Sequence, residues 1–305
     1  MADHRAHLDF TIGFANGGDL TGHGFRLDLP SADLDEAAIA RLLVAHLGLA
    51  LVREVRLTDL RVVEEPHRGS RGVDVPRTAD AARVVDLSHP IRAGLVTYPG
   101  LPAPVVRPYL TRADSRERYA PGTEFAMDVI ELIGNTGTYL DSPYHRYEDG
   151  ADLASLRLET LVGLRAEVFH LTDAWSPSRR GIDALALADR GLRGAAVLLH
   201  TGWDRHFGTP EYGRGAPFLT EDGAEHLIEQ GVALVGIDSV NIDDVESGGE
   251  RPAHTLLLAA GVHVVEHLTN LGALPPHGAR FTAAPPAIEG FGTFPVRAFA
   301  EVPAG

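Results

Sequence analysis

The densest run of small and polar residues in the chain is Asn135-Thr136-Gly137-Thr138-Tyr139-Leu140-Asp141-Ser142-Pro143-Tyr144-His145. Its small residues let the backbone turn tightly, and its polar groups recur at every second or fourth position. Such spacing can aim several side chains at one point, as a catalytic site requires. Asp141-Ser142-Pro143 alone is also compatible with a simple turn capped by the Asp side chain. The segment alone does not distinguish a catalytic site from a simple turn, so the surrounding sequence is needed.

Around this segment, short runs of Val, Ile and Leu alternate with helix-like stretches. Runs of the length of buried strands lie at residues 84–87, 196–200, 233–237 and 262–265. Helical patterns lie at residues 182–189 and 221–229. Short apolar runs that alternate with helices are typical of an α/β domain. We therefore predict an α/β fold in which a mixed sheet is surrounded by helices.

The first part of the chain has a different pattern, with strict alternation and a clear turn. Alternating apolar and polar residues on both sides of Asn16-Gly17-Gly18 predict a hairpin. We expect a helix from a cap at Ser31 or Asp33 to His46, followed by a strand over residues 52–63.

A polar stretch over residues 64–83 favours an exposed connection over a packed element. We place the domain boundary there. Residues 1–82 then form a small β-β-α-β module with its linker, and residues 83–305 form the catalytic domain. The sequence of the module contains no cluster of convergent catalytic groups, so we expect a structural role for it, in assembly or in covering the site.

The composition excludes several kinds of chemistry. The 305 residues include no Cys, and each of the 27 basic residues is Arg. Without Cys there is no thiolate nucleophile and no iron–sulfur ligand set. Without Lys there is neither a pyridoxal-phosphate anchor nor a phosphate-binding loop that ends in Gly-Lys. We expect no nucleotide, pyridoxal-phosphate or iron–sulfur cofactor, and catalysis is left to His, carboxylates, Tyr, Ser and a metal ion.

Charge and hydropathy limit the partners of the chain. A net charge of −15 repels phosphate backbones, so nucleic acid is not an expected partner. The apolar stretches are far shorter than the roughly 20 residues of a membrane-spanning helix, and no membrane contact is expected. The N-terminal residues show neither a signal peptide nor a transit peptide. We expect a cytoplasmic protein that binds a small molecule of aromatic or cyclic character.

The segment that ends at His145 resembles the signature of the cyclase family, His-x-Gly-Thr-His-x-Asp-x-Pro-x-His. Further segments are similar to other parts of that family, at residues 85–89, 98–100, 199–203, 236–239 and 252–266. The similarity thus extends over nearly all of the second domain, which a chance match of one short motif does not explain. The family includes kynurenine formamidases, isatin hydrolases and proteins resembling polyketide cyclases. The resemblance implies a swivelling β/β/α fold, an enzyme of bacterial type, and a homo-oligomer, either a dimer or a tetramer.

The resemblance also implies a metal centre. The family's centre takes two His and the Asp of the main motif, with a downstream His and Glu also available as ligands. Here Asn135 and Tyr139 occupy the places of the two His residues, and neither is a usual zinc ligand. Asp141, His254 and Glu266 are retained. Such a carboxylate-rich set could hold one divalent ion, manganese, magnesium or a weakly bound zinc.

A second interpretation of the same residues needs no metal. Tyr139 and Asn135 would then donate hydrogen bonds to a substrate carbonyl, and oxyanion stabilisation of this kind is chemically sufficient. His145 and Asp141 would form the acid/base pair, with the carboxylate holding the imidazole tautomer. If a metal binds, the resemblance implies that His145 acts instead as base or proton relay beside the attacking water.

Other residues have less specific patterns. Tyr98 and Trp203 are candidates for an aromatic substrate pocket, although aromatic side chains at strand ends more often belong to the core. Asp238, Asp243 and Asp244 follow a predicted strand, and we expect solvated loop charges there.

The run His263-Val264-Val265-Glu266-His267 fits the His-x-x-Glu-His pattern of inverted zinc peptidases, in which both His residues lie on one helical face. Gly261 and the Val-rich composition predict a strand instead. On a strand, His263 and Glu266 would point to opposite faces, so only Glu266 need enter the site.

Three functions are compatible with these residues. The leading hypothesis is arylformamidase-like hydrolysis of an amide or lactam, in which water attacks the carbonyl and His145 handles the proton. The first alternative is a metal-independent cyclase or lyase that acts on a carbonyl-rich natural-product intermediate, with Tyr139 stabilising an enolate. The second alternative is a non-catalytic binding or scaffold protein.

Overall fold

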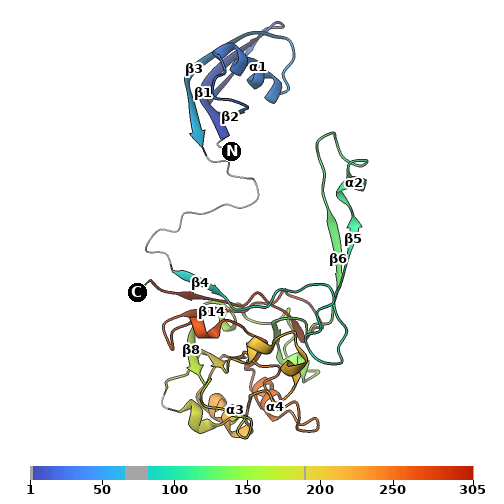
Figure 1. The fold of residues 1–305 in the computed structure, drawn as a ribbon, viewed down its shortest axis with the longest axis vertical. Coiled ribbons are helices and arrows are strands. Elements are labelled where there is room, and N and C mark those ends of the chain that lie inside the picture. The colour runs from blue at the N-terminus through green and yellow to red at the C-terminus, as the bar shows by residue number, and fades with distance from the viewer. Residues whose placement is uncertain (1–2, 66–81, 189, 305) are drawn as a thin grey trace. The chain divides into compact units, whose positions relative to one another are not determined.

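The computed structural model describes residues 3–65, 82–188 and 190–304. The chain divides into two compact units, Met1–Arg77 and Thr78–Gly305, each with a hydrophobic core of its own (Figure 1). We therefore describe each unit by itself. Most of the polar connection predicted over residues 64–83 lies outside the described residues.

The first unit is a three-stranded antiparallel sheet with one helix packed on it. Its strands are β1 (Asp3–Phe14), β2 (Asp19–Leu29) and β3 (Val52–Glu65), in the order β2-β1-β3, and its helix is α1 (Glu36–His46). Alternate residues of the strands, such as Leu8 and Ile12, pack against Ile39 and Leu43 of the helix. The hairpin and the third strand lie where the sequence predicted them, and the helix ends at His46 as predicted.

Helix α1 begins later than the sequence predicted. Its N-cap is Asp35, whose carboxylate accepts a hydrogen bond of 2.7 Å from the amide of Ala38. The hydroxyl of Ser31 instead accepts from the amide of Asp33 in the preceding turn, at 3.2 Å. The predicted cap at Ser31 or Asp33 is therefore wrong. The side chain of an N-cap residue accepts the backbone amide two or three positions later, and the residue three positions before Ala38 is Asp35.

The second unit is built on a nine-stranded mixed sheet in the order β15-β7-β13-β12-β10-β8-β14-β16-β4. Its four central strands are parallel: β8 (Leu164–His170), β10 (Ala196–His200), β12 (Leu234–Ile237) and β13 (His263–Glu266). The strands on both sides of them pair antiparallel: β4 (Arg83–Asp86), β7 (Tyr139–Asp141), β14 (Arg280–Thr282), β15 (Thr293–Pro295) and β16 (Phe299–Val302). This confirms the predicted α/β class with a mixed sheet.

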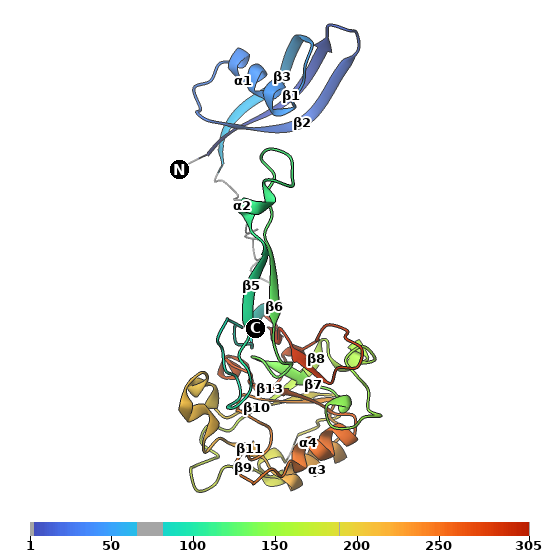
Figure 2. The same cartoon turned by 90° about the vertical axis from the view of Figure 1, so that its right-hand side faces the viewer.

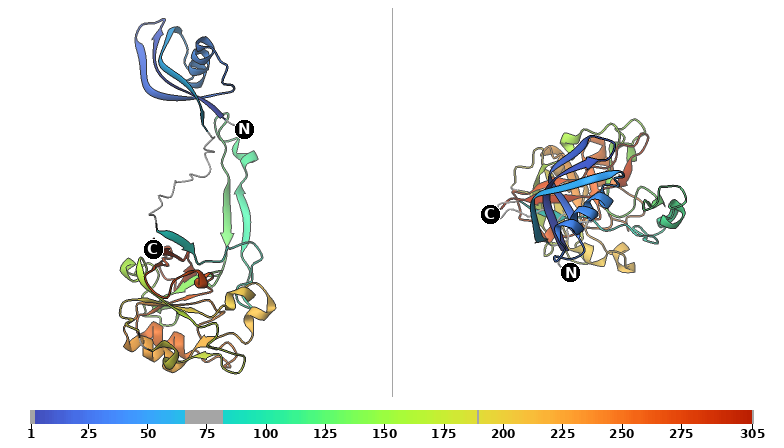
Figure 3. Two further views of the ribbon diagram at one scale, coloured as in Figure 1. Left: turned by 60° about the vertical axis from the view of Figure 1, so that its left-hand side comes forward. Right: turned by 90° about the horizontal axis from the view of Figure 1, so that it is seen from above.

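The central strands are buried on both faces, which explains their continuous apolar runs. Along β10, Leu198 points into one hydrophobic cluster, while Val197 and Leu199 point into another. The helices α3 (Glu221–Glu229) and α4 (Pro252–Ala259) cover the second face and belong to the second cluster, as Figures 2 and 3 show. The predicted helix over residues 221–229 is confirmed, and its cap is the side chain of Thr220.

The helix predicted over residues 182–189 is not formed over 182–188, the part of that range that the structure describes. The short strand β9 (Gly181–Ile182) pairs with β11 (Phe218–Leu219), and a single 3-10 turn, η3 (Ala184–Leu187), follows it. The carboxylate of Asp183 accepts the amide of Ala186 at 3.0 Å and closes this turn. Pairing with β11 therefore overrides a helical pattern too short to hold a helix by itself.

The sequence pattern missed a two-stranded arm in the second unit. Strands β5 (Val105–Leu110) and β6 (Met127–Glu131) pair antiparallel and project from the body of the unit, with the short helix α2 (Arg112–Ser115) between them (Figures 1 and 2). Large apolar side chains of the arm are exposed, among them Tyr109 at 70% and Phe125 at 51%. A strand with one buried face is recognised by alternating apolar and polar residues. The strands of the arm have no such buried face in the single chain, so this pattern could not predict them.

The remaining short helices are 3-10 turns: η1 (Pro143–His145), η2 (Leu158–Thr160), η4 (Trp203–His206), η5 (Pro210–Gly213) and η6 (Leu271–Ala273). Within the described ranges, no helix has the length and apolar character needed to cross a membrane.

Candidate active site

The candidate site begins with β7, which is paired on both sides. Antiparallel register places Tyr139 opposite Glu266 of β13 and Asp141 opposite Thr293 of β15. Residues directly opposite each other in such pairs share a face of the sheet and have Cβ atoms about 5 Å apart. The register alone therefore brings these four polar side chains together.

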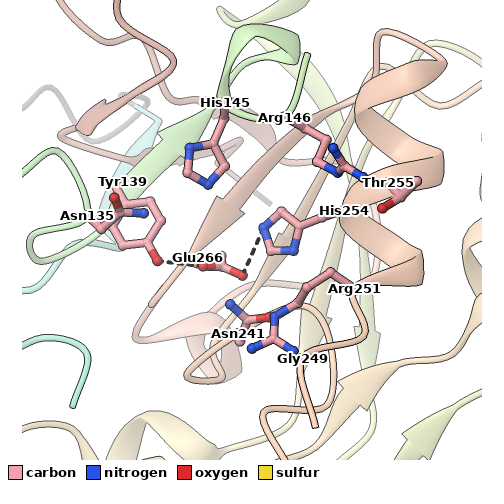
Figure 4. A pocket seen from close by; sticks show the side chains of 10 residues that line it. All are labelled: Asn135, Tyr139, His145, Arg146, Asn241, Gly249, Arg251, His254, Thr255 and Glu266. Atoms are coloured by element: carbon pink, nitrogen blue, oxygen red, sulfur yellow. Dashed lines mark hydrogen bonds and ion pairs between the residues drawn. The ribbon is translucent and has the colours of Figure 1, made fainter. Parts of the chain in front are cut away.

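Two of these residues, Tyr139 and Glu266, border a cavity of about 380 Å³. Figure 4 shows the side chains of His145 and His254 above and beside Glu266, with Arg146 and Arg251 flanking His254. The lining residues are Asn135, Tyr139, His145, Arg146, Asn241, Gly249, Arg251, His254, Thr255 and Glu266. Of the eight residues that the sequence singled out for the site, five line this cavity: Asn135, Tyr139, His145, His254 and Glu266. Asp141 lies buried directly behind them.

At the floor of the cavity, His254 lies between two carboxylates. Its Nε2 atom is 3.5 Å from Oδ2 of Asp141 and 3.6 Å from Oε1 of Glu266. All three side chains are at least nine-tenths buried. Oε1 of Glu266 also accepts the backbone amide of Ile242 at 2.6 Å.

Asp243 orients His254 from the other side. Its Oδ2 atom lies 2.6 Å from Nδ1 of His254 and also accepts the backbone amide of that residue, while Oδ1 accepts the amide of Ala253. Asp243 therefore caps the start of α4 and holds the ring so that Nε2 faces Asp141 and Glu266. The prediction that Asp243 is a solvated loop charge is wrong, since the residue is 2% exposed.

Burial and mutual charge shift the pKa values of these groups. Burial raises the pKa of Glu266 to about 7, against the opposing pull of His254. Burial alone would lower the pKa of His254, but the charge of Glu266 and the contacts with Asp141 and Asp243 raise it to about 10. For Asp141, the approach of His254 and the nearby charge of His145 outweigh burial and lower the pKa. We place the proton of this group on His254, where two carboxylates stabilise it.

This cluster fits a divalent cation. One ligand atom from each of Asp141, His254 and Glu266 can be chosen such that all lie within 4.8 Å of one another. Oδ2 of Asp141 is buried and has no hydrogen-bond partner among the described residues, because 3.5 Å is too long for one from His254. A buried carboxylate oxygen without a partner is costly, and two carboxylates with one imidazole are suitable ligands for manganese, magnesium or zinc.

His145 lies at the wall of the cavity and is held through Thr293. The Thr293 hydroxyl donates a short hydrogen bond to Oδ1 of Asp141, and it lies 2.7 Å from Nδ1 of His145. A hydroxyl has one proton, so Nδ1 of His145 must donate to it. In the neutral ring this leaves Nε2 as an unprotonated acceptor, and the side chain is 36% exposed. Asp141 thus sets the His145 tautomer through Thr293, which the sequence did not reveal.

Comparison with known proteins identifies the family of the chain. The model of the cyclase family, described as "Putative cyclase", matches residues 85–244. The chain belongs to the cyclase family. Asp141 and His145 lie within the matched range, and His254 and Glu266 lie beyond it.

Curated relatives of this cyclase-family chain include kynurenine formamidases. That of Geobacillus thermodenitrificans is 34% identical over 172 residues, which cover 55% of this chain and 77% of the relative. That of Bacillus cereus is 25% identical over 184 residues, which cover 60% and 81% of the two chains.

Solved structures similar to the chain include two kinds of hydrolase. An isatin hydrolase bound to the product analogue thioisatinate has a TM-score of 0.61 and 25% identity, over 73% of this chain and 94% of that one. A potential metal-dependent hydrolase with cyclase activity has a TM-score of 0.59 and 26% identity, over 74% of this chain and all of the other.

In this member of the cyclase family, Tyr139 stands where the motif resemblance implies a His. The Tyr139 hydroxyl donates to Oε2 of Glu266 at 2.6 Å, and the whole side chain is buried. Burial and the charges of Glu266 and Asp141 hold the pKa of Tyr139 well above its usual value, while a hydrogen bond with Asn135 opposes that shift. The phenolic proton is thus engaged by Glu266, whereas the metal-free interpretation had assigned it to a substrate carbonyl.

The two aromatic candidates lie away from this cavity. Trp203 packs with Tyr212 in a separate apolar cluster, and its indole N–H donates to the Tyr212 carbonyl at 2.9 Å. Tyr98 packs at the edge of the same cluster. Neither is among the lining residues of the cavity that holds His145 and His254.

The other aspartates after β12 are not solvated either. Asp238 is fully buried and accepts the amides of Thr201 and Gly202 as well as the Thr201 hydroxyl. Asp244 forms a two-pronged ion pair with Arg180, with both N···O distances at 2.9 Å. The expectation of solvated loop charges is therefore wrong for Asp238 and Asp243, which are buried, while Asp244 is partly exposed and paired with Arg180.

The strand expected at residues 262–265 is confirmed as β13. His263 lies on the face of the strand opposite to Glu266 and contacts the Thr160 hydroxyl at 3.0 Å. The inverted zinc peptidase pattern therefore has no structural counterpart here.

Proposed function

We propose that this cyclase-family chain is a hydrolase that cleaves the C–N bond of an N-formyl amide or a lactam. The observation that carries the proposal is the cluster of Asp141, His254 and Glu266 at one cavity, with the imidazole of His145 at the wall of that cavity. Relatives named for kynurenine formamidase and isatin hydrolase activity support the same bond type.

In the proposed reaction His145 moves the proton. Its Nε2 accepts a proton from the attacking water as the new C–O bond forms. The same imidazolium then donates that proton to the leaving nitrogen as the C–N bond breaks, giving an amine and a carboxylic acid, which releases its own proton to water and becomes a carboxylate. Thr293 and Asp141 keep the ring in the tautomer that this cycle needs.

Asp141, His254 and Glu266 would hold one divalent cation, manganese, magnesium or zinc. When bound, such an ion polarises a carbonyl and lowers the pKa of water. Asp243 keeps Nε2 of His254 turned toward that position, the arrangement in which a carboxylate supports a ligating imidazole.

Two arginines at the cavity support an anionic group on the substrate. Among the described residues, no carboxylate lies within ion-pair distance of the guanidinium of Arg146 or Arg251. Arg146 lies over the Tyr147 ring, 5.3 Å from its centroid. Arg251 donates through Nη1 to backbone carbonyls such as that of Glu250 at 2.7 Å. In a chain of net charge −15, these two cations favour an amide that carries a carboxylate.

The test is a direct assay of the purified protein. Metal-depleted protein is reloaded with Mn²⁺, Mg²⁺ or Zn²⁺ and given an aryl N-formyl amide with a carboxylate and a lactam of similar size. Release of amine and formate, or of the ring-opened acid, is measured by chromatography. The proposal fails if neither substrate turns over with any ion, or if His145→Asn is as active as the wild type.

The two alternatives drawn from the sequence are not favoured. A cyclase or lyase that uses Tyr139 to stabilise an enolate needs the phenolic proton, which Glu266 already accepts. A scaffold protein has no need for the buried charged groups of Asp141, His254 and Glu266, since such groups cost stability.

The arm formed by β5 and β6 supports the proposal of a homo-oligomer. A two-stranded ribbon is only marginally stable by itself, and this one exposes Val105, Tyr109, Phe125 and Ile130 by half or more. We propose that a second copy of the chain covers it. Light scattering should give a dimer or larger, and Tyr109→Asp with Ile130→Asp should reduce it to a monomer. A monomeric wild type would contradict this.

A further inference from the structure

Behind Tyr139 lies a chain of hydrogen bonds that the proposed mechanism does not use. The Tyr212 hydroxyl is 2.8 Å from Nδ1 of His267, and Nε2 of His267 is 3.2 Å from the Tyr139 hydroxyl. Tyr139 in turn donates to Oε2 of Glu266 at 2.6 Å. Each member of the chain is at least 98% buried.

The direction of every hydrogen bond in this chain is determined by counting protons. The phenol of Tyr139 has one proton, which it gives to the carboxylate of Glu266. Its oxygen must therefore accept from Nε2–H of His267. A neutral imidazole carries one N–H, so Nδ1 accepts, and Tyr212 donates to it. All three donors point toward Glu266.

The backbone of His267 indicates that this side chain is specifically needed there. Its φ angle is +56°, in the left-handed region that non-glycine residues rarely occupy. Such a conformation costs of order 1 kcal/mol or more and persists where the surroundings require it. Here the strained residue places its ring between two tyrosines.

We propose that Tyr212 and His267 are positioning residues that keep the Tyr139 proton on Oε2 of Glu266, so that Glu266 presents only Oε1 to the cation. The inference rests on the proposed role of Glu266 as a cation ligand. Oε1 already accepts the amide of Ile242, which leaves it one direction, toward His254 and Asp141. The phenol of Tyr139 thus determines which oxygen of Glu266 is available to the cation.

The loss of Tyr212 would release this arrangement without touching the cavity. In Tyr212→Phe, Nδ1 of His267 loses its donor, so the ring can carry its proton on either nitrogen. When Nε2 is unprotonated, the Tyr139 hydroxyl can turn to it and leave Glu266. His267→Asn removes the ring while keeping a residue that tolerates the left-handed backbone, and should have the same effect.

The first measurement is the tautomer of His267, by long-range ¹H–¹⁵N correlation on protein labelled in its histidines and without metal. His267→Asn assigns the signals by their loss. We expect the proton on Nε2 in the wild type and a mixed population in Tyr212→Phe. A wild-type proton on Nδ1, or an unchanged tautomer in Tyr212→Phe, would overturn the proposal.

The second measurement is the affinity and absorption spectrum of Co²⁺ alone. Loss of a supporting partner of a metal ligand typically costs 10- to 100-fold in affinity, and we expect about tenfold for Tyr212→Phe, with a changed spectrum. Ser239→Ala is the matched control, because its buried hydroxyl also donates one hydrogen bond, to the Pro217 carbonyl at 2.6 Å, and neither residue lines the cavity or belongs to this series of hydrogen bonds. It should leave both readouts unchanged.

The outcomes separate this inference from the proposed function. Equal Co²⁺ affinity in the wild type and Tyr212→Phe overturns the positioning role, even if the enzyme hydrolyses amides. If the wild type shows the expected tautomer but binds no Co²⁺, the proposed cation site is wrong. The proposal that Glu266 offers only Oε1 to a cation is then wrong as well.

Discussion

Oδ2 of Asp243 and Nδ1 of His254 are 2.6 Å apart, although the two residues belong to different elements. The carboxylate lies in the loop after β12, and the imidazole projects from the first turn of α4. The same carboxylate caps that turn through the amides of Ala253 and His254. One side chain therefore sets both the start of the helix and the direction of its ligating ring.

Asp243→Asn should weaken Mn²⁺ binding by about tenfold or more, the usual effect of losing a carboxylate behind a ligating His. Asn still caps helices well, so the fold should persist. The measurement is calorimetric titration with Mn²⁺. Asp244→Asn is the control, since it loses the ion pair with Arg180 but does not contact His254. Equal affinities in both variants would contradict the role of Asp243.

Thr293→Val should lower kcat by about 100-fold with little change in KM, because His145 loses the group that fixes its tautomer while the cavity keeps its shape. Thr293→Ser retains the hydroxyl and should stay within a few-fold of the wild type. Steady-state kinetics at several pH values test this. Comparable loss in both variants would indicate a packing effect instead.

The proton on His254 predicts how pH acts on the metal-free protein. The pKa of His254 is raised to about 10 in the fold, above about 6.5 in the unfolded chain. Its contribution to stability is therefore complete below pH 6.5 and is lost as pH rises through 10. The melting temperature of chelator-treated protein should fall over this range.

A cation must displace the same proton, so Mn²⁺ affinity should rise with pH across this window. The protein loaded with Mn²⁺ should accordingly lose less thermal stability than the chelated protein between pH 7 and 10. Parallel melting curves for the two forms would show that His254 does not hold the ion.

Arg146→Gln should raise KM for a carboxylate-bearing amide by about 10-fold or more, since a charge-assisted hydrogen bond contributes about 1.5–3 kcal/mol. A neutral amide of the same shape should be unaffected by the substitution. Arg157→Gln, at an exposed ion pair with Glu159, controls for loss of charge alone. An equal change for both amides would rule out recognition of the anionic group.

Gly292→Ala should destabilise the protein and lower its activity together. A Cβ at this position would lie 2.4 Å from the backbone N of His145 and 2.5 Å from its Cα, which forces the η1 segment to move. Gly191→Ala is the control, because a Cβ there meets nothing within 4 Å and its backbone is not left-handed. Thermal melts and kcat of both variants test the expectation.

Much of the fold could be predicted from alternation and apolar runs. The β-β-α-β module and the central strands are each marked by residues that pack on one or two faces. The arm of β5 and β6 could not be predicted in this way, because its apolar residues face solvent in the single chain. The helix expected over residues 182–189 failed because a pairing with β11 is invisible from local sequence.

The sequence predicted only those residues of the site that belong to the recognised motifs. Asp141, His254 and Glu266, which the motifs mark, lie together in the structure. Thr293 lies 152 residues from Asp141 and meets it only through the register of β15 and β7. Asp243 carried no signal, since it stands 11 residues before His254 with a loop between them. Contacts of this kind depend on tertiary pairing.

The position of β15 at the edge of the sheet has a consequence for synthesis of the chain. A nascent polypeptide that has emerged through β13 already contains all three proposed cation ligands, yet it lacks Thr293 and so the hydroxyl that orients His145. Because chains emerge N-terminus first, Thr293 is among the last residues of the proposed site to be made. By the proposed mechanism, turnover therefore requires β15 to have paired with β7.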